Sequence, residues 1–184
     1  TFLCTFLMFS HFIANLDDVP KIEILMASSI SSLLGELLNE HQLEAAQESM
    51  GLDTQLIEDG TYFLVKKDEV LIGSGGYSFR KTLFGGNHTP NRSDDLLVPG
   101  KDAAKVRAMY TNPSWTRKGV GSYILTLAEN SIAQLGFNKV ELMATVSGIL
   151  LYEKRGYKVV EEIEYKSKLG NKVPMYKMEK FIHG

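Results

Sequence analysis

Residues 112–122, Asn-Pro-Ser-Trp-Thr-Arg-Lys-Gly-Val-Gly-Ser, carry the clearest chemical signal in the sequence, where a strand-like run hands over to a helix-like run. The first turn of a helix leaves four backbone N–H groups unpaired, and the helix dipole adds about half a positive charge there. Gly119 and Gly121 let an anion approach these groups closely, while Arg117 and Lys118 add mobile positive charge. The segment therefore predicts a binding site for a diphosphate.

The spacing of the glycines narrows the kind of anion site. The sequence contains no G-x-x-x-x-G-K-[S/T] string, which excludes a Walker-type phosphate loop. A dinucleotide fingerprint, G-x-G-x-x-G, would begin at Gly119 and Gly121, but Ile124 stands where its third glycine is needed. A nucleotide-binding α/β domain remains an alternative that this missing glycine weakens.

Three motifs together resemble the GNAT N-acetyltransferase superfamily. Residues 116–121, Thr-Arg-Lys-Gly-Val-Gly, resemble its motif A, [Q/R]-x-x-G-x-[G/A]. Residues 150–157 resemble its L-Y-x-x-x-G-[F/Y] signature, and residues 73–77 resemble the G-x-G-G-[W/Y] string of one branch. The motifs follow the family's order and spacing, and the resemblance covers nearly the whole chain. Thr116 departs from motif A, although its hydroxyl is suited to cap a helix.

The resemblance implies acetyl-CoA as the co-substrate. In the family, motif A holds the pyrophosphate, and the splayed end of the fourth strand pairs with the pantetheine arm. The cofactor-binding residues implied here are Met109, Tyr110, Thr111, Arg117, Lys118, Gly119, Val120, Gly121 and Ser122. Tyr152 matches the family tyrosine that protonates the leaving thiolate, and a phenol with a pKa of about 10 suits that role. A core aromatic at a helix end is the alternative interpretation of Tyr152.

The acceptor side is less defined. Tyr77, Arg80 and Arg107 are candidate substrate-binding residues, although an exposed strand arginine is an equally good interpretation. The fourth strand carries no carboxylate, so the general base stays open between Tyr77, His88, Glu141 and a chain of waters. Residues 80–103 form a long polar loop with several Gly and Pro residues, which predicts a mobile loop that selects the acceptor.

Composition bounds the class of protein. The 184 residues fit one acetyltransferase domain, 1–184, in which 1–9 form an uncertain N-terminal extension. Twenty Lys and Arg against 22 Asp and Glu give a net charge of −2, which argues against a nucleic-acid partner. The one cysteine, Cys4, and the scattered histidines predict no metal site, and the cysteine is consistent with a reducing cytoplasm. The apolar N-terminal run is too short to span a membrane as a helix.

Periodicity and resemblance together predict the α+β class. We expect a GNAT-like mixed, mostly antiparallel central sheet flanked by helices, in the order β-α-α-β-β-β-α-β-α-β-β. Strands are expected at residues 12–14, 62–67, 70–77, 105–111, 139–144, 159–168 and 173–180. Helices are expected from residue 17 or 18 to 33, at 36–48, from motif A to 135, and around Tyr152.

The function that these features predict is acetyl transfer from acetyl-CoA to a primary amine of a small molecule, by direct attack in a ternary complex. Two alternatives stay open: a non-catalytic acyl-CoA-binding module, and an enzyme that acetylates a protein or peptide amine. The sequence predicts neither a nucleic-acid nor a membrane partner, and it leaves a homodimer open.

Overall fold

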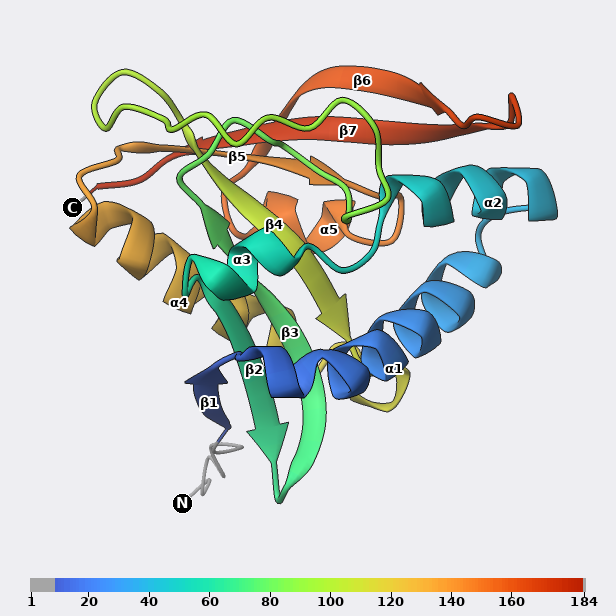
Figure 1. Ribbon diagram of the computed structural model, residues 1–184, viewed down its shortest axis with the longest axis horizontal. Coiled ribbons are helices and arrows are strands. Elements are labelled where there is room, and N and C mark those ends of the chain that lie inside the picture. Colours follow the sequence, from blue (N-terminus) through green and yellow to red (C-terminus); the bar gives the residue numbers. More distant parts are fainter. Residues whose placement is uncertain (1–8, 184) are drawn as a thin grey trace.

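A computed structural model describes residues 9–183 and has one seven-stranded sheet with helices on both faces (Figure 1). The strands lie in the order β1-β2-β3-β4-β5-β7-β6, and β4 and β5 form the parallel pair among otherwise antiparallel neighbours. The strands are β1 (Ser10–Ile13), β2 (Tyr62–Lys67), β3 (Val70–Ser78), β4 (Ala104–Thr111), β5 (Lys139–Ala144), β6 (Lys158–Lys166) and β7 (Lys172–Phe181). The helices are α1 (Val19–Ser29), α2 (Glu40–Ser49), α3 (Thr54–Glu58), α4 (Val120–Gln134) and α5 (Ile149–Lys154).

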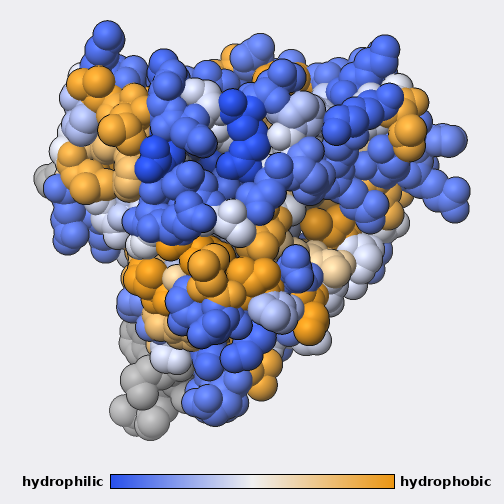
Figure 2. All heavy atoms as spheres, viewed as in Figure 1, coloured by the Kyte–Doolittle hydropathy of each residue, from blue (hydrophilic) through white to orange (hydrophobic). Residues whose placement is uncertain are grey.

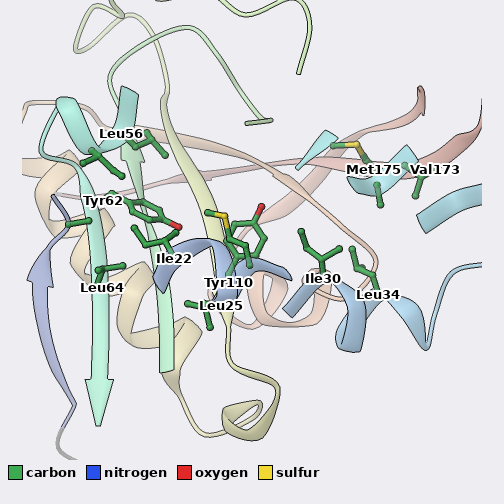
Figure 3. Close-up of a cluster of buried hydrophobic side chains, with 14 of the residues drawn as sticks. Ile22, Leu25, Ile30, Leu34, Leu56, Tyr62, Leu64, Tyr110, Val173 and Met175 are labelled. Carbon is green, nitrogen blue, oxygen red and sulfur yellow. The ribbon is translucent and has the colours of Figure 1, made fainter. Parts of the chain in front are cut away.

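The helices form two layers around the sheet. Figure 1 shows α1, α2, α3 and the long loop between β3 and β4 on one face, with α4 and α5 on the other. A buried cluster fills each side: Ile22, Leu25 and Tyr62 belong to the first, Leu125 and Leu142 to the second. Figure 3 shows Tyr62 and Tyr110 of the sheet pointing toward the side chains of α1. The two apolar layers hold β4 and β5 between them at the middle of the sheet.

Glycines in β3 allow α4 to lie close to the sheet. A Cβ atom at Gly73 would come within 2.4 Å of Val120, and one at Gly75 would come within 2.9 Å of Ile124. Gly76 faces the other way, where a Cβ would stand 2.0 Å from the carbonyl oxygen of Thr61. The glycine-rich string that resembles a family motif therefore sets the depth at which α4 packs.

The structure confirms the predicted fold class, and three helices differ from the expectation. The first, expected from residue 17 or 18 to 33, is α-helical over Val19–Ser29 and continues as a π-helix over Ile30–Leu34. The second helix was expected from residue 36, but α2 begins at Glu40 because Asn39 caps it. Asn39 accepts from the N–H of Gln42 at 2.9 Å, and the Gln42 side chain accepts from the N–H of Asn39 at 3.1 Å. The short helix α3 was not predicted, and its cap is the Asp53 side chain.

The remaining sequence expectations concern the first strand and the N-terminus. The strand expected at 12–14 is β1, which spans Ser10–Ile13. Just after it, the N–H of Ala14 donates to the carbonyl oxygen of Tyr62 at 2.9 Å. Cys4 and most of the expected N-terminal extension lie outside the described residues. Within residues 9–183, no helix is long and apolar enough to cross a membrane.

Candidate active site

The start of α4 has the backbone that an anion site needs. Gly119, the N-cap residue, has a left-handed φ of 86°, and Arg117 two residues earlier has a φ of 59°. No side chain caps this end of the helix. A Cβ atom at Gly119 would meet nothing within 4 Å, so no other described residue crowds this α-carbon. The diphosphate site stays a prediction, which this backbone supports because unpaired N–H groups and the helix dipole favour negative charge.

The side chains around this turn leave the helix end free. The hydroxyl of Thr116 donates to the carbonyl oxygen of Pro113 at 3.3 Å, so the expected helix cap by Thr116 was wrong. Lys118 donates to the carbonyl oxygen of Ser114 at 3.1 Å, and its ammonium lies 4.9 Å from the centre of the Trp115 ring. Lys118 is thereby held beside the turn.

Gly121 joins the first turn of α4 to α5. A Cβ atom at Gly121 would come within 2.6 Å of the Leu151 side chain. The absence of a side chain at Gly121 therefore lets α5 approach the turn. Since Tyr152 follows Leu151 on α5, the predicted diphosphate site and the predicted acid are connected through this contact.

The parallel pair β4–β5 opens into a cleft. Its ladder is limited to two pairs, Ala104 with Val140 and Lys105 with Glu141, and beyond them β4 runs away from β5 (Figure 1). A bulge between β3 and β4 accompanies this divergence, and Ala108 there has a φ of 52°. The backbone of β4 that faces β5 is therefore left without a ladder partner, which suits an extended ligand arm.

A cleft lies where the two strands part. Its lining includes two of the predicted cofactor residues, Met109 and Tyr110, as well as the predicted acid Tyr152. The other lining residues are Ser49, Met50, Gly51, Leu83, Phe84, Gly85, Val106, Arg107, Ala108, Leu142, Met143, Thr145 and Met175. Residues from six separate segments thus converge on one cleft.

Tyr152 reaches the cleft from α5. Its ring packs edge-on against Tyr157 at 5.9 Å, and a Cβ atom at Gly148 would stand 2.9 Å from the ring. Burial, with a smaller contribution from Tyr110, raises the pKa of the Tyr152 hydroxyl above its ordinary value. The hydroxyl therefore stays protonated at neutral pH and can donate a proton into the cleft.

The floor of the cleft is fixed by tyrosines. The Tyr110 hydroxyl accepts a hydrogen bond from the N–H of Gly51 at 3.0 Å, and burial raises the pKa of Tyr110 to about 12. The Tyr62 hydroxyl is 2.8 Å from the Ser74 hydroxyl and 3.0 Å from the carbonyl oxygen of Ala108. These bonds hold the bulged part of β4 in place.

None of the three side chains considered as general base lines this cleft. Tyr77 lies against the α4 layer, with its ring 6.3 Å from that of Phe63. His88 places Nε2 3.1 Å from the carbonyl oxygen of Gln47. The structure therefore does not bring the three candidates to the acid.

Glu141 is held by two lysines. It is ion-paired with Lys105, and its other oxygen lies 3.4 Å from the ammonium of Lys177. Burial acts to raise the pKa of Glu141, but the hydrogen bond and charge of Lys105 and the charge of Lys177 outweigh it, and the net shift is downward. A carboxylate with a lowered pKa is a poor proton acceptor.

The other predicted substrate residues, Arg80 and Arg107, are engaged in ion pairs. Arg80 binds both oxygens of Asp59, at 2.7 and 2.8 Å. Arg107 is 3% exposed, lines the cleft, and donates to Asp53 at 2.8 Å. Arg107 therefore lies at the site, whereas Arg80 belongs to the base of the loop.

The loop between β3 and β4 is held by the body of the protein at several points. Arg107 donates to the carbonyl oxygens of Thr82 and Gly85, at 3.1 and 2.8 Å. Further along, the Thr89 hydroxyl donates to the carbonyl oxygen of Glu48 at 2.7 Å. The polar composition that suggested a mobile loop instead supplies the groups that anchor it.

Beside the cleft, α2 contacts the β6–β7 hairpin. Glu48 accepts from the Tyr165 hydroxyl at 2.8 Å, and Glu44 accepts from Ser167 and Asn171, both at 2.7 Å. Tyr165 also packs edge-on against Phe84 of the loop at 5.8 Å. No local sequence signal connected these three segments, because their contacts join residues far apart in the chain: Glu48 and Tyr165 are 117 positions apart.

Residues 30–157 match the family model of the acetyltransferase (GNAT) family. The chain belongs to this family. The match covers most of the chain and confirms the predicted family and enzyme class. No curated protein sequence matches the chain significantly.

Solved GNAT structures share the fold over nearly the whole chain. A GCN5-related N-acetyltransferase from Rhodopseudomonas palustris is 16% identical, with 94% of this chain and 95% of that chain covered and a TM-score of 0.68. The PaiA N-acetyltransferase from Thermoplasma acidophilum, in complex with coenzyme A, is 16% identical over 95% and 99%, with a TM-score of 0.61. YncA from Salmonella typhimurium, solved with acetyl-CoA, is 13% identical over 96% and 95%, with a TM-score of 0.62. These similarities establish the fold.

Proposed function

We propose that this GNAT enzyme transfers the acetyl group of acetyl-CoA to the primary amine of a small molecule, by direct attack in a ternary complex. The observation that carries the proposal is the cleft between the diverging strands, into which Tyr152 and β4 both face. The uncapped start of α4 supports it, because an anion can bind there while the rest of the ligand extends toward the cleft.

The residues that would hold acetyl-CoA are those of the α4 turn and of β4. The N–H groups between Arg117 and Ser122 would bind the diphosphate, and the unpaired backbone of Met109 to Thr111 would pair with the pantetheine arm. Acetyl-CoA supplies the activated thioester. The binding energy of its remote parts positions that thioester, and such positioning can account for a large share of rate acceleration.

Tyr152 is proposed to donate a proton to the leaving thiolate. Its raised pKa keeps the hydroxyl protonated, and its place on α5, next to Leu151 and Gly121, connects it with the diphosphate turn. No carboxylate or histidine is among the described lining residues of the cleft. We therefore propose that the amine enters as the free base or loses its proton to water.

The lining of the cleft favours a small acceptor over a protein. The cleft must accommodate both the thioester end and the amine, and its lining is mostly apolar with one buried cation, Arg107. The contacts of Glu44 and Glu48 with the β6–β7 hairpin, and of Phe84 with Tyr165, tie together three segments beside the cleft and would restrict the entry of a polypeptide there. Ribosomal-protein alanine N-acetyltransferases from Escherichia coli and Brucella melitensis share this fold, but a shared fold does not assign their acceptor to this chain.

Thiol release from acetyl-CoA in the presence of a panel of primary amines tests the proposal. We expect amine-dependent release of CoA, with the N-acetylated amine as the product identified by mass spectrometry. A panel of short peptides serves as the comparison. Binding of acetyl-CoA without turnover of any amine, or turnover of peptides alone, would contradict the proposed function.

A further inference from the structure

One charged side chain lines the active-site cleft among the described residues, and it is a cation. Arg107 comes from β4 and is 3% exposed, and its neighbours in the lining are apolar side chains such as Leu83, Phe84 and Met143. Burying a charge is costly unless it is paired and hydrogen-bonded. The partners of this guanidinium therefore show whether its charge is already satisfied.

Arg107 keeps part of its donor capacity. A guanidinium has five N–H groups. Three hydrogen bonds use three of them: to Asp53 at 2.8 Å, to Gly85 at 2.8 Å and to Thr82 at 3.1 Å. The other two donate to no residue in the part of the chain that the structure describes. Because Arg107 lines the cleft, a ligand there can accept these hydrogen bonds in place of water.

The carboxylate that pairs with Arg107 is shared with a second arginine. Asp53 accepts from Arg107 on one oxygen and from Arg92 on the other, at 2.6 Å. Asp53 also caps α3 by accepting from the N–H of Gln55 at 3.1 Å. One negative charge therefore faces two positive charges, and the group carries one positive charge in excess.

Arg92 is incompletely satisfied as well. Its Nη1 atom is buried and has no hydrogen-bond partner among residues 9–183. Burial lowers the pKa of Arg107, and although Asp53 opposes this shift, the charge of Arg92 adds to it. The two guanidinium groups thus destabilise one another, and an anion beside them would relieve that repulsion.

We propose that Arg107, supported by Arg92, binds an anionic group of the acceptor, so that the acceptor is an amine that also carries a carboxylate. This inference rests on the proposed function and names its substrate class. The apolar lining residues Met50, Leu83 and Phe84 would contact a hydrophobic part of the same molecule. The positive charge also disfavours the ammonium form of a nearby amine, which helps to keep the attacking nitrogen neutral.

The test compares amino acids with the amines left when their carboxylate is removed. The probes are L-phenylalanine, L-methionine and aminohexanoate, each beside its decarboxylated amine. Two readouts are taken on the full chain: kcat/KM from thiol release with acetyl-CoA, and the shift in Tm that each compound causes with CoA present. We expect at least one acid to exceed its amine by roughly tenfold in kcat/KM, as a hydrogen-bonded charge would give, and to raise Tm more.

Two variants locate the effect. In Arg107→Gln and in Arg92→Gln, the preference for the acid should fall toward unity, while the apparent affinity for acetyl-CoA stays unchanged. Lys81→Gln, which removes an exposed loop cation paired with Asp95, is the matched control and should keep the preference. Arg92→Gln is included because Arg107→Gln, in the buried cluster, can lower stability.

The outcomes separate this inference from the proposed function. Acids that neither react faster nor stabilise the protein more than their decarboxylated amines would overturn the inference, and thiol release with those amines would leave the acetyltransferase function standing. A preference for acids that survives in both arginine variants would also overturn it, since the anion would then be bound elsewhere. Loss of thiol release with every amine would count against the proposed function itself.

Discussion

The two ends of the active-site cleft are built in different ways. At the proposed cofactor end, the contacts are local. The side chain of Asn112 accepts a hydrogen bond from the N–H of Ser114, and the ammonium of Lys118 donates to the carbonyl oxygen of Ser114, four positions away. At the acceptor end, Arg107 pairs with Asp53 across 54 positions. The contacts of Glu44 and Glu48 with the β6–β7 hairpin span more than a hundred positions.

This difference explains why the cofactor end has a recognisable sequence motif. A diphosphate is bound mainly by backbone N–H groups, so the turn needs particular φ angles and open space, which a few consecutive residues specify. An acceptor is recognised by side chains, and long-range pairs such as Glu48 with Tyr165 can change in many ways while the fold remains. The two ends should therefore respond to different mutations.

The largest expected effect comes from the residue that faces both ends. Tyr152→Phe removes the proposed acid and keeps the ring that packs against Tyr157. We expect kcat to fall by roughly a hundredfold or more, as loss of a general acid does, with little change in acetyl-CoA binding by calorimetry. Tyr157→Phe, which loses a hydrogen bond to Glu129 at 3.0 Å, is the control and should turn over normally.

The pH profile sharpens this assignment. Because burial raises the pKa of Tyr152, deprotonation of the acid is shifted upward and begins above the ordinary phenol pKa of about 10. The rate of the parent enzyme should therefore rise with pH as the amine loses its proton, with no descending limb below about pH 10. Parental turnover in Tyr152→Phe across this range would refute the acid role.

A change at the α4 turn should weaken cofactor binding alone. Gly119→Asn keeps a residue type that tolerates the left-handed conformation and places a side chain in the open space before the helix. We expect the Kd for acetyl-CoA to rise roughly tenfold or more, as loss of charge-assisted hydrogen bonds would cause. Gly100→Asn is the control, since Gly100 has a φ of 80° and open space but lies in the loop. Equal affinity in Gly119→Asn would reject the diphosphate site.

A smaller effect on kcat is expected from a substitution at Gly148, which lies next to the ring of Tyr152. A Cβ atom at Gly148 would stand 2.9 Å from the Tyr152 ring, so Gly148→Ala must displace that ring. We expect kcat to fall several-fold, up to about tenfold, because a displacement of this size disturbs proton transfer. Gly35→Ala meets nothing within 4 Å and is the matched control. A Gly148→Ala enzyme with parental kcat would show that the position of the ring does not limit turnover.

The sequence predicted the fold well where a pattern is local. Most strands were located within one or two residues, because alternation and turn signals specify them, and the Asp68–Glu69 turn joins β2 and β3 as expected. The start of α2 was misplaced because the capping side chain of Asn39 overrides helix-compatible residues before it. Helix α3 is five residues long, too short for its periodicity to be detected.

The candidate site could be predicted only in part. The turn before α4 and Tyr152 had motifs, whereas Asp53 and Arg92 lie in segments without one, and their pairing with Arg107 depends on how the loop folds back. For Glu141 the sequence predicted a role that the structure does not support. Its residue type suggested a general base, but its carboxylate oxygens are ion-paired with Lys105 and Lys177. Residue type predicts chemistry only when its neighbours are known.

The most direct test of the central claim measures both substrates in two variants, one at each end. Gly119→Asn and Glu48→Gln are compared with the parent enzyme by determining KM for acetyl-CoA and KM for one accepted amine by thiol release. The account predicts that Gly119→Asn raises only the KM for acetyl-CoA, and that Glu48→Gln, which loses its charged contact with Tyr165 and Lys168, raises only the KM for the amine. If either variant raised both KM values, the claim that separate sets of residues bind acetyl-CoA and the amine would be contradicted.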